Sequence, residues 1–182
     1  YNKARRIRKI TMLIVITFFC LMLVSVNAQD VVITGNITTN TELTANNTYL
    51  LKGLVRVQSG ATLTIQEGTK IYGANDGSPD PASALIIKPG GKLIANGTEL
   101  NPIIFTSEFN RPGSSRLPTY GDWGGVILLG TAPINVPGGT AIIEGPGDSF
   151  GGTNPDDDSG ILRYVRIEYT GFAYSLNNEI NG

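Results

Sequence analysis

Apolar and polar residues alternate in short runs along most of the chain, as in residues 55–57, 63–65 and 103–105. Alternation places every second side chain on one face of an extended strand, so each run predicts a strand with one buried face. Glycine and other turn formers separate the runs, for example at residues 89–91. The body of the chain is therefore expected to be all-β.

An internal repeat adds a second level of order. Residues 57–65 (VQSGATLTI) match residues 87–95 (IKPGGKLIA) at an offset of 30 positions, each copy reading as strand, glycine turn, strand. Such a unit cannot bury its own inner face and needs stacked neighbours, so the repeat predicts one coil of a solenoid. An ordinary β-sandwich with a chance match is the alternative. The inner stack is expected to contain Val55, Val57, Leu63, Ile65, Leu85, Ile87, Leu93, Ile103 and Phe105.

Three glycine- and proline-rich segments interrupt the coils, at residues 73–83, 109–122 and 135–160. The third contains a short apolar run, residues 141–143, which predicts an extra strand. Long insertions in a solenoid usually gather on one side and often carry its function. We therefore expect the three segments to collect on one side of the solenoid.

The first 28 residues follow a different pattern. Five bases and no acid lie among residues 1–9, an apolar run follows at 10–26, and a small residue, Ala28, precedes Gln29. A basic start, an apolar centre and a small-residue exit predict a helical signal peptide, residues 1–28, cleaved between Ala28 and Gln29. An uncleaved membrane anchor is the alternative, although a spanning helix needs about 20 apolar residues.

Cleavage there changes the charge of the remaining chain. Five of the 14 Lys and Arg residues precede the cut and none of the 15 Asp and Glu residues do, so residues 29–182 carry a net charge of −6. An acidic surface without clustered bases argues against nucleic-acid binding. The chain has no histidine, and its one cysteine, Cys20, lies in the signal segment. The remaining part therefore has no disulfide, no thiol nucleophile and no Cys/His metal site.

Several longer motifs resemble a known group of proteins. They are GDWGGVILLGTAPIN (121–135), GGTNPDDDSG (151–160), ILRYVRIEYTGF (161–172), NEING (178–182) and YLLKGLVRVQSGATLTIQEGTKIYG (49–73). These motifs are similar to those of secreted right-handed parallel β-helix proteins of Bacteroidota-type bacteria, which share a pectate-lyase-like architecture. The resemblance implies the fold and export, in many members with a downstream sorting domain for type IX secretion. It implies no particular reaction.

The resemblance also sets the expected domain organisation. A signal peptide, residues 1–28, would precede a right-handed parallel β-helix domain, residues 29–182, that stops inside a motif and so forms an N-terminal fragment with an open last coil. Such a coil exposes unpaired strand edges. We expect the mature chain to be a monomer, secreted or on the outer cell surface, with no membrane contact after signal removal.

The densest charge cluster is Asp156-Asp157-Asp158. Carboxylates on a loop can bind Ca²⁺ through oxygen, so these three residues are the candidate metal site. Their spacing matches no Ca²⁺ loop in detail, and a solvated acidic turn is the alternative. No other cofactor is expected.

Four further residues are candidates for ligand binding. Arg166 and Glu168, two positions apart, would share the outer face of one strand, with Arg163 nearby. They offer a sugar-contacting or acid/base surface, and an ordinary surface ion pair of about 0–1 kcal/mol is the alternative. Trp123 is the candidate for stacking on a sugar, within a group of aromatic residues in the second half of the chain. Its alternative is a packed position at a coil corner, behind the glycines that follow it.

Two functions from different classes fit these features. The leading hypothesis is a secreted or cell-surface scaffold or adhesin-like protein that contacts a glycan without catalysis. The alternative is a carbohydrate-active β-helix enzyme, a lyase or hydrolase of acidic polysaccharide. The net charge of −6 would repel an anionic substrate and so favours the first. The expected partner is an extracellular polysaccharide or another cell-surface component.

Overall fold

The computed structural model describes residues 29–75, 83–176 and 178–181 of the chain. The predicted signal peptide, which ends at Ala28, lies outside the described residues. Apart from one short 3₁₀ turn at Glu108–Asn110, every regular element of the described part is a β-strand, as the alternating pattern predicts. In this part of the chain no helix has the length and apolar character needed to cross a bilayer.

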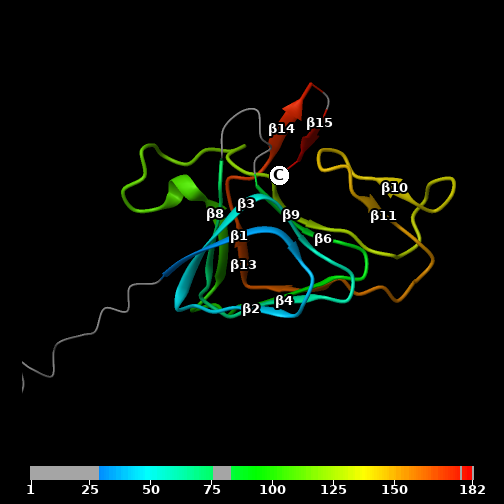
Figure 1. Ribbon diagram of the computed structural model, residues 1–182, viewed down its shortest axis with the longest axis horizontal. Coiled ribbons are helices and arrows are strands. Elements are labelled where there is room, and N and C mark those ends of the chain that lie inside the picture. Colours follow the sequence, from blue (N-terminus) through cyan, green and yellow to red (C-terminus); the bar gives the residue numbers. More distant parts are fainter. Residues whose placement is uncertain (1–28, 76–82, 177, 182) are drawn as a thin grey trace, which may run out of the picture.

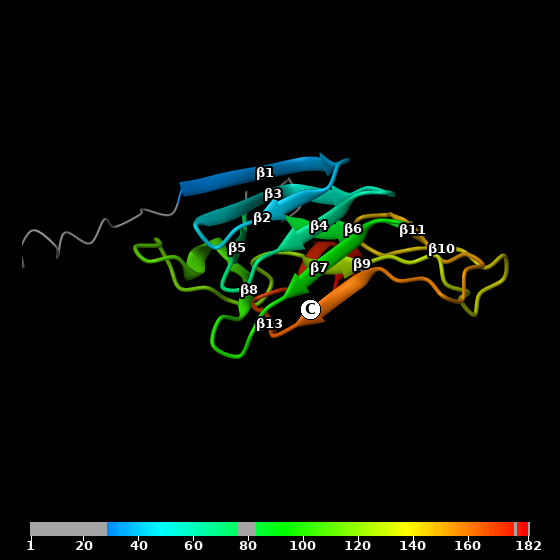
Figure 2. The same ribbon diagram turned by 90° about the horizontal axis from the view of Figure 1, so that it is seen from below.

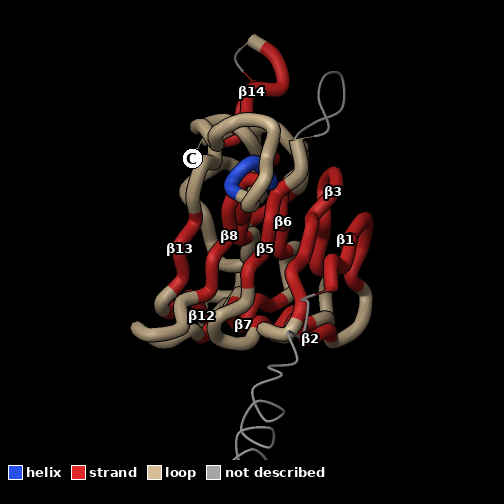
Figure 3. The backbone as a smooth tube through the Cα atoms, turned by 90° about the vertical axis from the view of Figure 1, so that its left-hand side faces the viewer, coloured by secondary structure: helices blue, strands red, loops and turns tan. Residues whose placement is uncertain are grey.

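The strands stack into three walls (Figures 2 and 3). We call them the first, second and third walls in the order in which each coil visits them, and all pairing within them is parallel. The first wall contains β1 (Gln29–Ile37), β3 (Asn47–Val57), β5 (Lys70–Gly73), β8 (Ile103–Ser107) and β13 (Val165–Ile167). The second wall contains the ends of β1 and β3, then β6 (Ala84–Ile87) and β9 (Gly125–Leu128). The third wall contains β2 (Thr41–Leu43), β4 (Thr62–Ile65), β7 (Lys92–Asn96) and β12 (Gly160–Arg163).

Strand β3 serves two walls because it bends at Gly53. Residues 48–51 pair with β5 in the first wall, whereas residues 54–57 pair with β6 in the second. Gly53 has a φ of 61° at the bend, a conformation that glycine adopts without steric cost. The chain therefore winds as a parallel β-helix, with four turns through all three walls and a fifth that begins at β13.

The internal repeat and the predicted inner stack are both confirmed. Val57 pairs with Ile87 and Leu63 pairs with Leu93, which is the offset of 30 seen in the sequence. All nine side chains predicted to face inward are at most 2% exposed. Full burial of one such side chain contributes about 1.5–3 kcal/mol. Stacked parallel coils, rather than the facing sheets of a sandwich, therefore hold the structure together.

The insertions fall on two corners rather than one. Residues 74–83, most of which lie outside the described residues, and residues 108–124 both connect a first-wall strand to the second wall. Residues 129–159 connect β9 to β12, at the corner between the second and third walls, and project away from residues 108–124 (Figure 1). The expectation that all three insertions lie on one side is therefore wrong for the third, because it leaves the coil one wall later.

Two antiparallel hairpins extend from the coils. The third insertion contains β10 (Ala141–Ile142) paired with β11 (Ser149–Phe150), which confirms the extra strand predicted there. After β13 the chain forms β14 (Phe172–Ser175) and β15 (Asn178–Ile180), at the same corner as residues 108–124. In Figure 1 this hairpin stands beyond the first and second walls.

A second, smaller core lies on the outer face of the second wall. Every residue of β6 is buried, because its outward side chains, like its inward ones, are covered. The outward side chains Ala84 and Ile86 cluster with Ile127, Leu129 and Ile180. Ile180 belongs to β15, so this cluster fixes the last hairpin against the outside of the coil.

Candidate functional site

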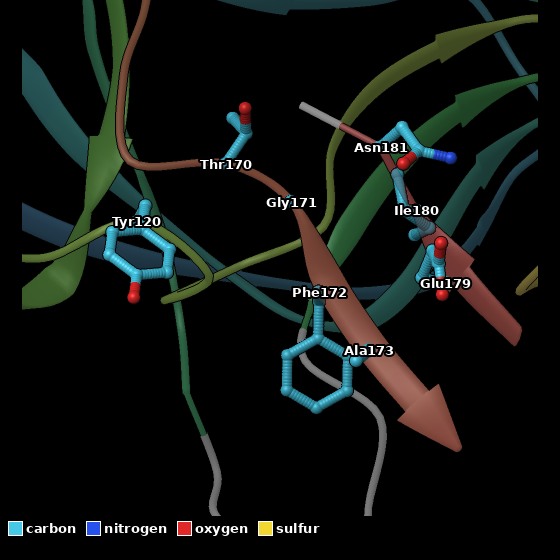
Figure 4. Close-up of a pocket in the computed structure, with 8 residues that line it drawn as sticks. All are labelled: Tyr120, Thr170, Gly171, Phe172, Ala173, Glu179, Ile180 and Asn181. Carbon is cyan, nitrogen blue, oxygen red and sulfur yellow. The ribbon is translucent and has the colours of Figure 1, made fainter. Parts of the chain in front are cut away.

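Two cavities border β15, and we refer to them together as the β15 site. The first, of about 370 Å³, is lined by Tyr120, Thr170, Gly171, Phe172, Ala173, Glu179, Ile180 and Asn181 (Figure 4). The second, of about 390 Å³, is lined by Val126, Ile127, Ile143, Glu144, Glu179, Ile180 and Asn181. Glu179, Ile180 and Asn181 line both cavities, so β15 is common to the two. Their volumes fall in the range of small-molecule sites, about 300–1,000 Å³.

Close backbone approach places β15 where it lines both cavities. A Cβ on Gly124 would lie 2.7 Å from Ile180 Cδ1 and 3.0 Å from Ala84 Cβ, so the glycine leaves room for the Ile180 side chain in the outer cluster. The Gly145 N–H donates to Asn178 Oδ1 at 2.8 Å, and the Glu179 N–H donates to Glu144 Oε1 at 3.3 Å. These two hydrogen bonds connect β15 to the third insertion, which therefore forms the far side of the second cavity.

The buried carboxylate of Asp122 positions the loop that carries Tyr120. It accepts hydrogen bonds from Ser107 Oγ at 2.6 Å, Arg116 Nη2 at 2.5 Å and the Thr119 N–H at 3.0 Å. Burial raises the pKa of Asp122, but the hydrogen bonds from Arg116 and Ser107 outweigh it and hold the pKa below 3.8. The charged carboxylate therefore fastens the loop, while the Tyr120 ring, two positions away, is 87% exposed.

A backbone hydrogen bond joins two segments that line the first cavity and lie far apart in the sequence. The Gly121 N–H donates to the Thr170 carbonyl oxygen at 3.0 Å, which ties the Tyr120 loop to the chain after β13. In Figure 4 the rings of Tyr120 and Phe172 point the same way, while Thr170 points the opposite way. The two rings and the Thr170 hydroxyl therefore lie at different parts of the cavity, with Glu179 and Asn181 on its β15 side.

The chemistry of the lining suits a sugar. Aromatic rings offer flat apolar surface, and the Thr170 hydroxyl, the Asn181 amide and the Glu179 carboxylate offer donors and acceptors for hydroxyl groups. A few convergent polar groups on an otherwise apolar wall are typical of ligand sites. Among the residues that the structure describes, no lysine, arginine or histidine lines either cavity.

Trp123 lies in the core and has no exposed surface. Its ring stacks on Phe105 with centroids 6.5 Å apart, and its Nε1–H donates to the Glu168 carbonyl oxygen at 2.8 Å. A Cβ on Gly73 would lie 2.4 Å from the indole, so Gly73, rather than the glycines after Trp123, makes room for it. The indole is therefore inaccessible to a ligand. Trp123 occupies the packed position that was the alternative, and it is not available for stacking on a sugar.

The three other candidate ligand-binding residues do not converge on one surface. Tyr164, with a φ of 47°, turns the chain between Arg163 at the end of the third wall and β13 in the first. Arg163 lies over the Tyr164 ring, 5.4 Å from its centroid. Arg166 instead forms an ion pair with Glu168, whose carboxylate also accepts from Asn110 Nδ2 at 3.4 Å. The pair sits on the outside of the coil, as predicted, but apart from the β15 site.

The carboxylates of residues 156–158 do not share a partner. Asp157 accepts hydrogen bonds from the hydroxyls of Thr131 and Ser159, and these hold its pKa below 3.8. Asp158 forms an ion pair with Lys92 at 2.9 Å, and Asp156 is exposed. Within the described residues, no three acidic, histidine or cysteine side chains gather closely enough to hold a metal ion. The geometry of Asp156, Asp157 and Asp158 therefore does not support the candidate Ca²⁺ site.

Asp148 attaches the third insertion to the second wall. This residue is 8% exposed, and it accepts hydrogen bonds from Arg56 Nε at 3.1 Å and Lys88 Nζ at 2.6 Å. Burial raises the pKa of Asp148, but these two cations outweigh it and hold the pKa below 3.8. The insertion that carries Glu144 is therefore held in place by a partly buried charge triad.

Replacing Asp148 with asparagine is expected to lower the free energy of unfolding by about 2 kcal/mol at neutral pH, because two cations would then face a neutral amide. The expected loss is smaller than for a fully buried pair, since both cations keep part of their contact with water. A lowered carboxylate pKa stabilises the fold fully above the unfolded value of about 3.9, and this stabilisation is lost as pH falls through the lower folded value. Urea unfolding of both proteins from pH 7 down to about pH 3 should therefore show the difference shrinking below about pH 4. A difference that stays constant would contradict this role of Asp148.

Sequence reasoning singled out only part of the β15 site. Tyr120 and Phe172 belong to the aromatic group in the second half of the chain, and Glu179 and Asn181 lie in the motif NEING (178–182), but no functional role was predicted for these two or for Glu144. They become neighbours only when the insertions are placed on their corners. The usable signal was the alternation of residues 103–105 and 165–167, because aligning these runs as stacked strands puts the segments after them side by side.

The comparisons with known proteins agree with this architecture. The family of pectate-lyase-like β-helix domains matches residues 35–182, which include every residue of the β15 site. No curated protein and no solved structure matches the chain. The family match fits a carbohydrate-related β-helix protein, whereas the bacterial group and the sorting route expected from the sequence remain predictions. Because the match spans most of its length, the chain belongs to the family of pectate-lyase-like β-helix domains.

Proposed function

We propose that this protein is an exported β-helix, secreted or displayed on the outer cell surface, that contacts a glycan at the β15 site without turning it over. The observation that carries the proposal is the first cavity, which the exposed Tyr120 ring and Phe172 line together with Thr170 and Asn181. A glycan chain presents apolar ring faces and hydroxyl edges, and this lining matches both. The basic start and apolar run of residues 1–28 support export.

The absence of turnover is supported by how the charged side chains are engaged. Arg166 is paired with Glu168, and the buried carboxylates Asp122 and Asp148 are held by cations. An acid or base that works on a substrate must come within about 3 Å of the proton it moves. None of these four groups lines a cavity of the β15 site, so none of them is placed to move a proton of a glycan bound there.

Tyr120→Ala is expected to weaken glycan binding at least about tenfold, because burying an aromatic ring contributes about 1.5–3 kcal/mol. A glycan array probed with residues 29–182 would identify the bound chain, and calorimetry would then compare the variants. Leu117→Ala is the matched control, since Leu117 is 86% exposed on the same loop but does not line the cavity. Equal losses in both variants, or no array signal above background, would contradict the proposed site.

The enzymatic alternative has its own readout. Incubating the protein with the bound polysaccharide, with and without Ca²⁺, and following unsaturated products and new reducing ends would detect a lyase or a hydrolase. We expect no turnover above a heat-denatured control. Sustained product formation would replace the scaffold or adhesin-like role with a carbohydrate-active enzyme.

A further inference from the structure

We propose that the β15 site accepts a glycan that donates hydrogen bonds, either neutral or bearing free amines, and rejects polyuronates. This inference rests on the proposed function and specifies its ligand class. It starts from Glu179, which lines both cavities, and Glu144, which lines the second. The first cavity is therefore lined by one carboxylate and the second by two.

The hydrogen bonding of these two residues leaves them suited to accepting from a ligand. Glu144 Oε1 accepts one hydrogen bond, from the Glu179 N–H at 3.3 Å. An ionised carboxylate has about four acceptor sites and no donor. Sugar hydroxyls and ammonium groups can supply the donors that such acceptors need, whereas a uronate carboxylate cannot.

Five of the nine bases in residues 29–182 form ion pairs elsewhere in the fold. Arg56 and Lys88 are paired with Asp148, Lys92 with Asp158, Arg116 with Asp122 and Arg166 with Glu168. None of these five bases lines a cavity of the β15 site. A uronate chain there would meet two like charges without a compensating cation, and like charges held close together repel.

The charge of the whole molecule acts in the same direction. Residues 29–182 carry a net charge of −6, which lowers the local concentration of polyanions and raises that of cations near the surface. This longer-range effect is screened within about 8–10 Å at physiological salt, whereas contact with Glu179 is screened less. The two effects can therefore be separated by varying the ionic strength.

The test is calorimetric titration of residues 29–182 with three oligosaccharides of equal length. They are a neutral gluco-oligosaccharide, a de-N-acetylated chito-oligosaccharide and an oligogalacturonate. We expect the neutral and amine-bearing chains to bind, and the oligogalacturonate to bind at least about tenfold more weakly than either. If the oligogalacturonate binds as tightly as the others, the ligand class is wrong while the proposed function stands. If none of the three binds, the proposed function fails as well.

The Glu179→Gln variant tests whether this residue sets the preference. We expect the ratio of affinities for the amine-bearing chain and the oligogalacturonate to shrink several-fold, because the substitution removes the charge and keeps the shape. Glu144→Gln should act in the same direction, which covers the case in which the first variant folds poorly. Glu99→Gln is the matched control, since Glu99 is exposed and lies away from both cavities. Unchanged ratios in both site variants would overturn the assignment.

Discussion

Gly160→Ala is expected to lower the free energy of unfolding by about 3 kcal/mol or more, combining backbone strain with overpacking. Gly160 begins β12 and pairs with Leu93 of β7, with a φ of 129° that disfavours any side chain. A Cβ there would lie 1.9 Å from the Leu93 carbonyl oxygen, so the third and fourth coils would have to separate on the third wall. The midpoint of urea unfolding, followed by the fluorescence of the single tryptophan, measures the loss.

Gly113→Ala is the matched control for this prediction. Gly113 also has a positive φ, 78°, but an added Cβ would meet nothing within 4 Å. We expect this variant to lose only about 1 kcal/mol, from the backbone conformation alone. If the two variants lose the same amount, the close stacking of β12 on β7 is not as described here.

Trp123→Ala is expected to cost about 3–5 kcal/mol, the usual range for removing a fully buried aromatic side chain. The indole fills the space over Gly73 and stacks on Phe105, so its removal opens a cavity where the Tyr120 loop joins the coil. Because this variant has no tryptophan, circular dichroism during urea unfolding is the suitable probe. The loss should also weaken glycan binding, since the loop that carries Tyr120 ends at Trp123.

Trp123→Phe separates packing from hydrogen bonding. Phenylalanine keeps an aromatic ring against Phe105 but loses the Nε1–H that donates to the Glu168 carbonyl oxygen. We expect it to cost about 1–2 kcal/mol, in line with one lost hydrogen bond and a small cavity. A Trp123→Ala variant as stable as Trp123→Phe would show that the indole is not the central packing element of this corner.

The stacked walls could be predicted from the sequence because two consecutive coils have the same length between their second and third walls. Val57 and Leu63 in one coil correspond to Ile87 and Leu93 in the next, with no insertion between the members of each pair. The inner residues therefore repeat at a fixed offset and alternate with polar ones. Local alternation and the repeat point to the same fold, which is why the core prediction succeeded.

The fourth coil could not be predicted in the same way. Its strands β8, β9 and β12 are separated by insertions at residues 108–124 and 129–159, so the period is lost although the pairing continues. The β15 site depends on this coil. Tyr120 and Glu179 line the same cavity only because of where the two insertions leave the coil. In addition, β14 and β15 pair antiparallel, unlike the strands of the walls, and no repeat in the sequence predicts this.

Burial and long-range contacts, which the sequence does not show, decide what the candidate residues can contact. Trp123 was proposed for a surface because of its chemistry, but a bulky ring beside glycines also fills a corner, and here Gly73 provides the space from another coil. The acidic run at residues 156–158 suggested a metal from its charge, yet Lys92 and Thr131 hold two of its carboxylates apart. In both cases, contacts with residues distant in the sequence decide the role.

Hydrogen–deuterium exchange, with and without the oligosaccharide that binds in the array, tests the central claim most directly. We predict that the ligand slows exchange in residues 118–126, 142–145, 169–173 and 178–181, which line or support the two cavities. Tyr120→Ala should abolish this protection. The segment that contains the other candidate residues, Arg163, Arg166 and Glu168, should exchange at the same rate with and without the oligosaccharide. Protection confined to residues 160–168, or spread evenly along the outer faces of the coils, would contradict a glycan site at β15.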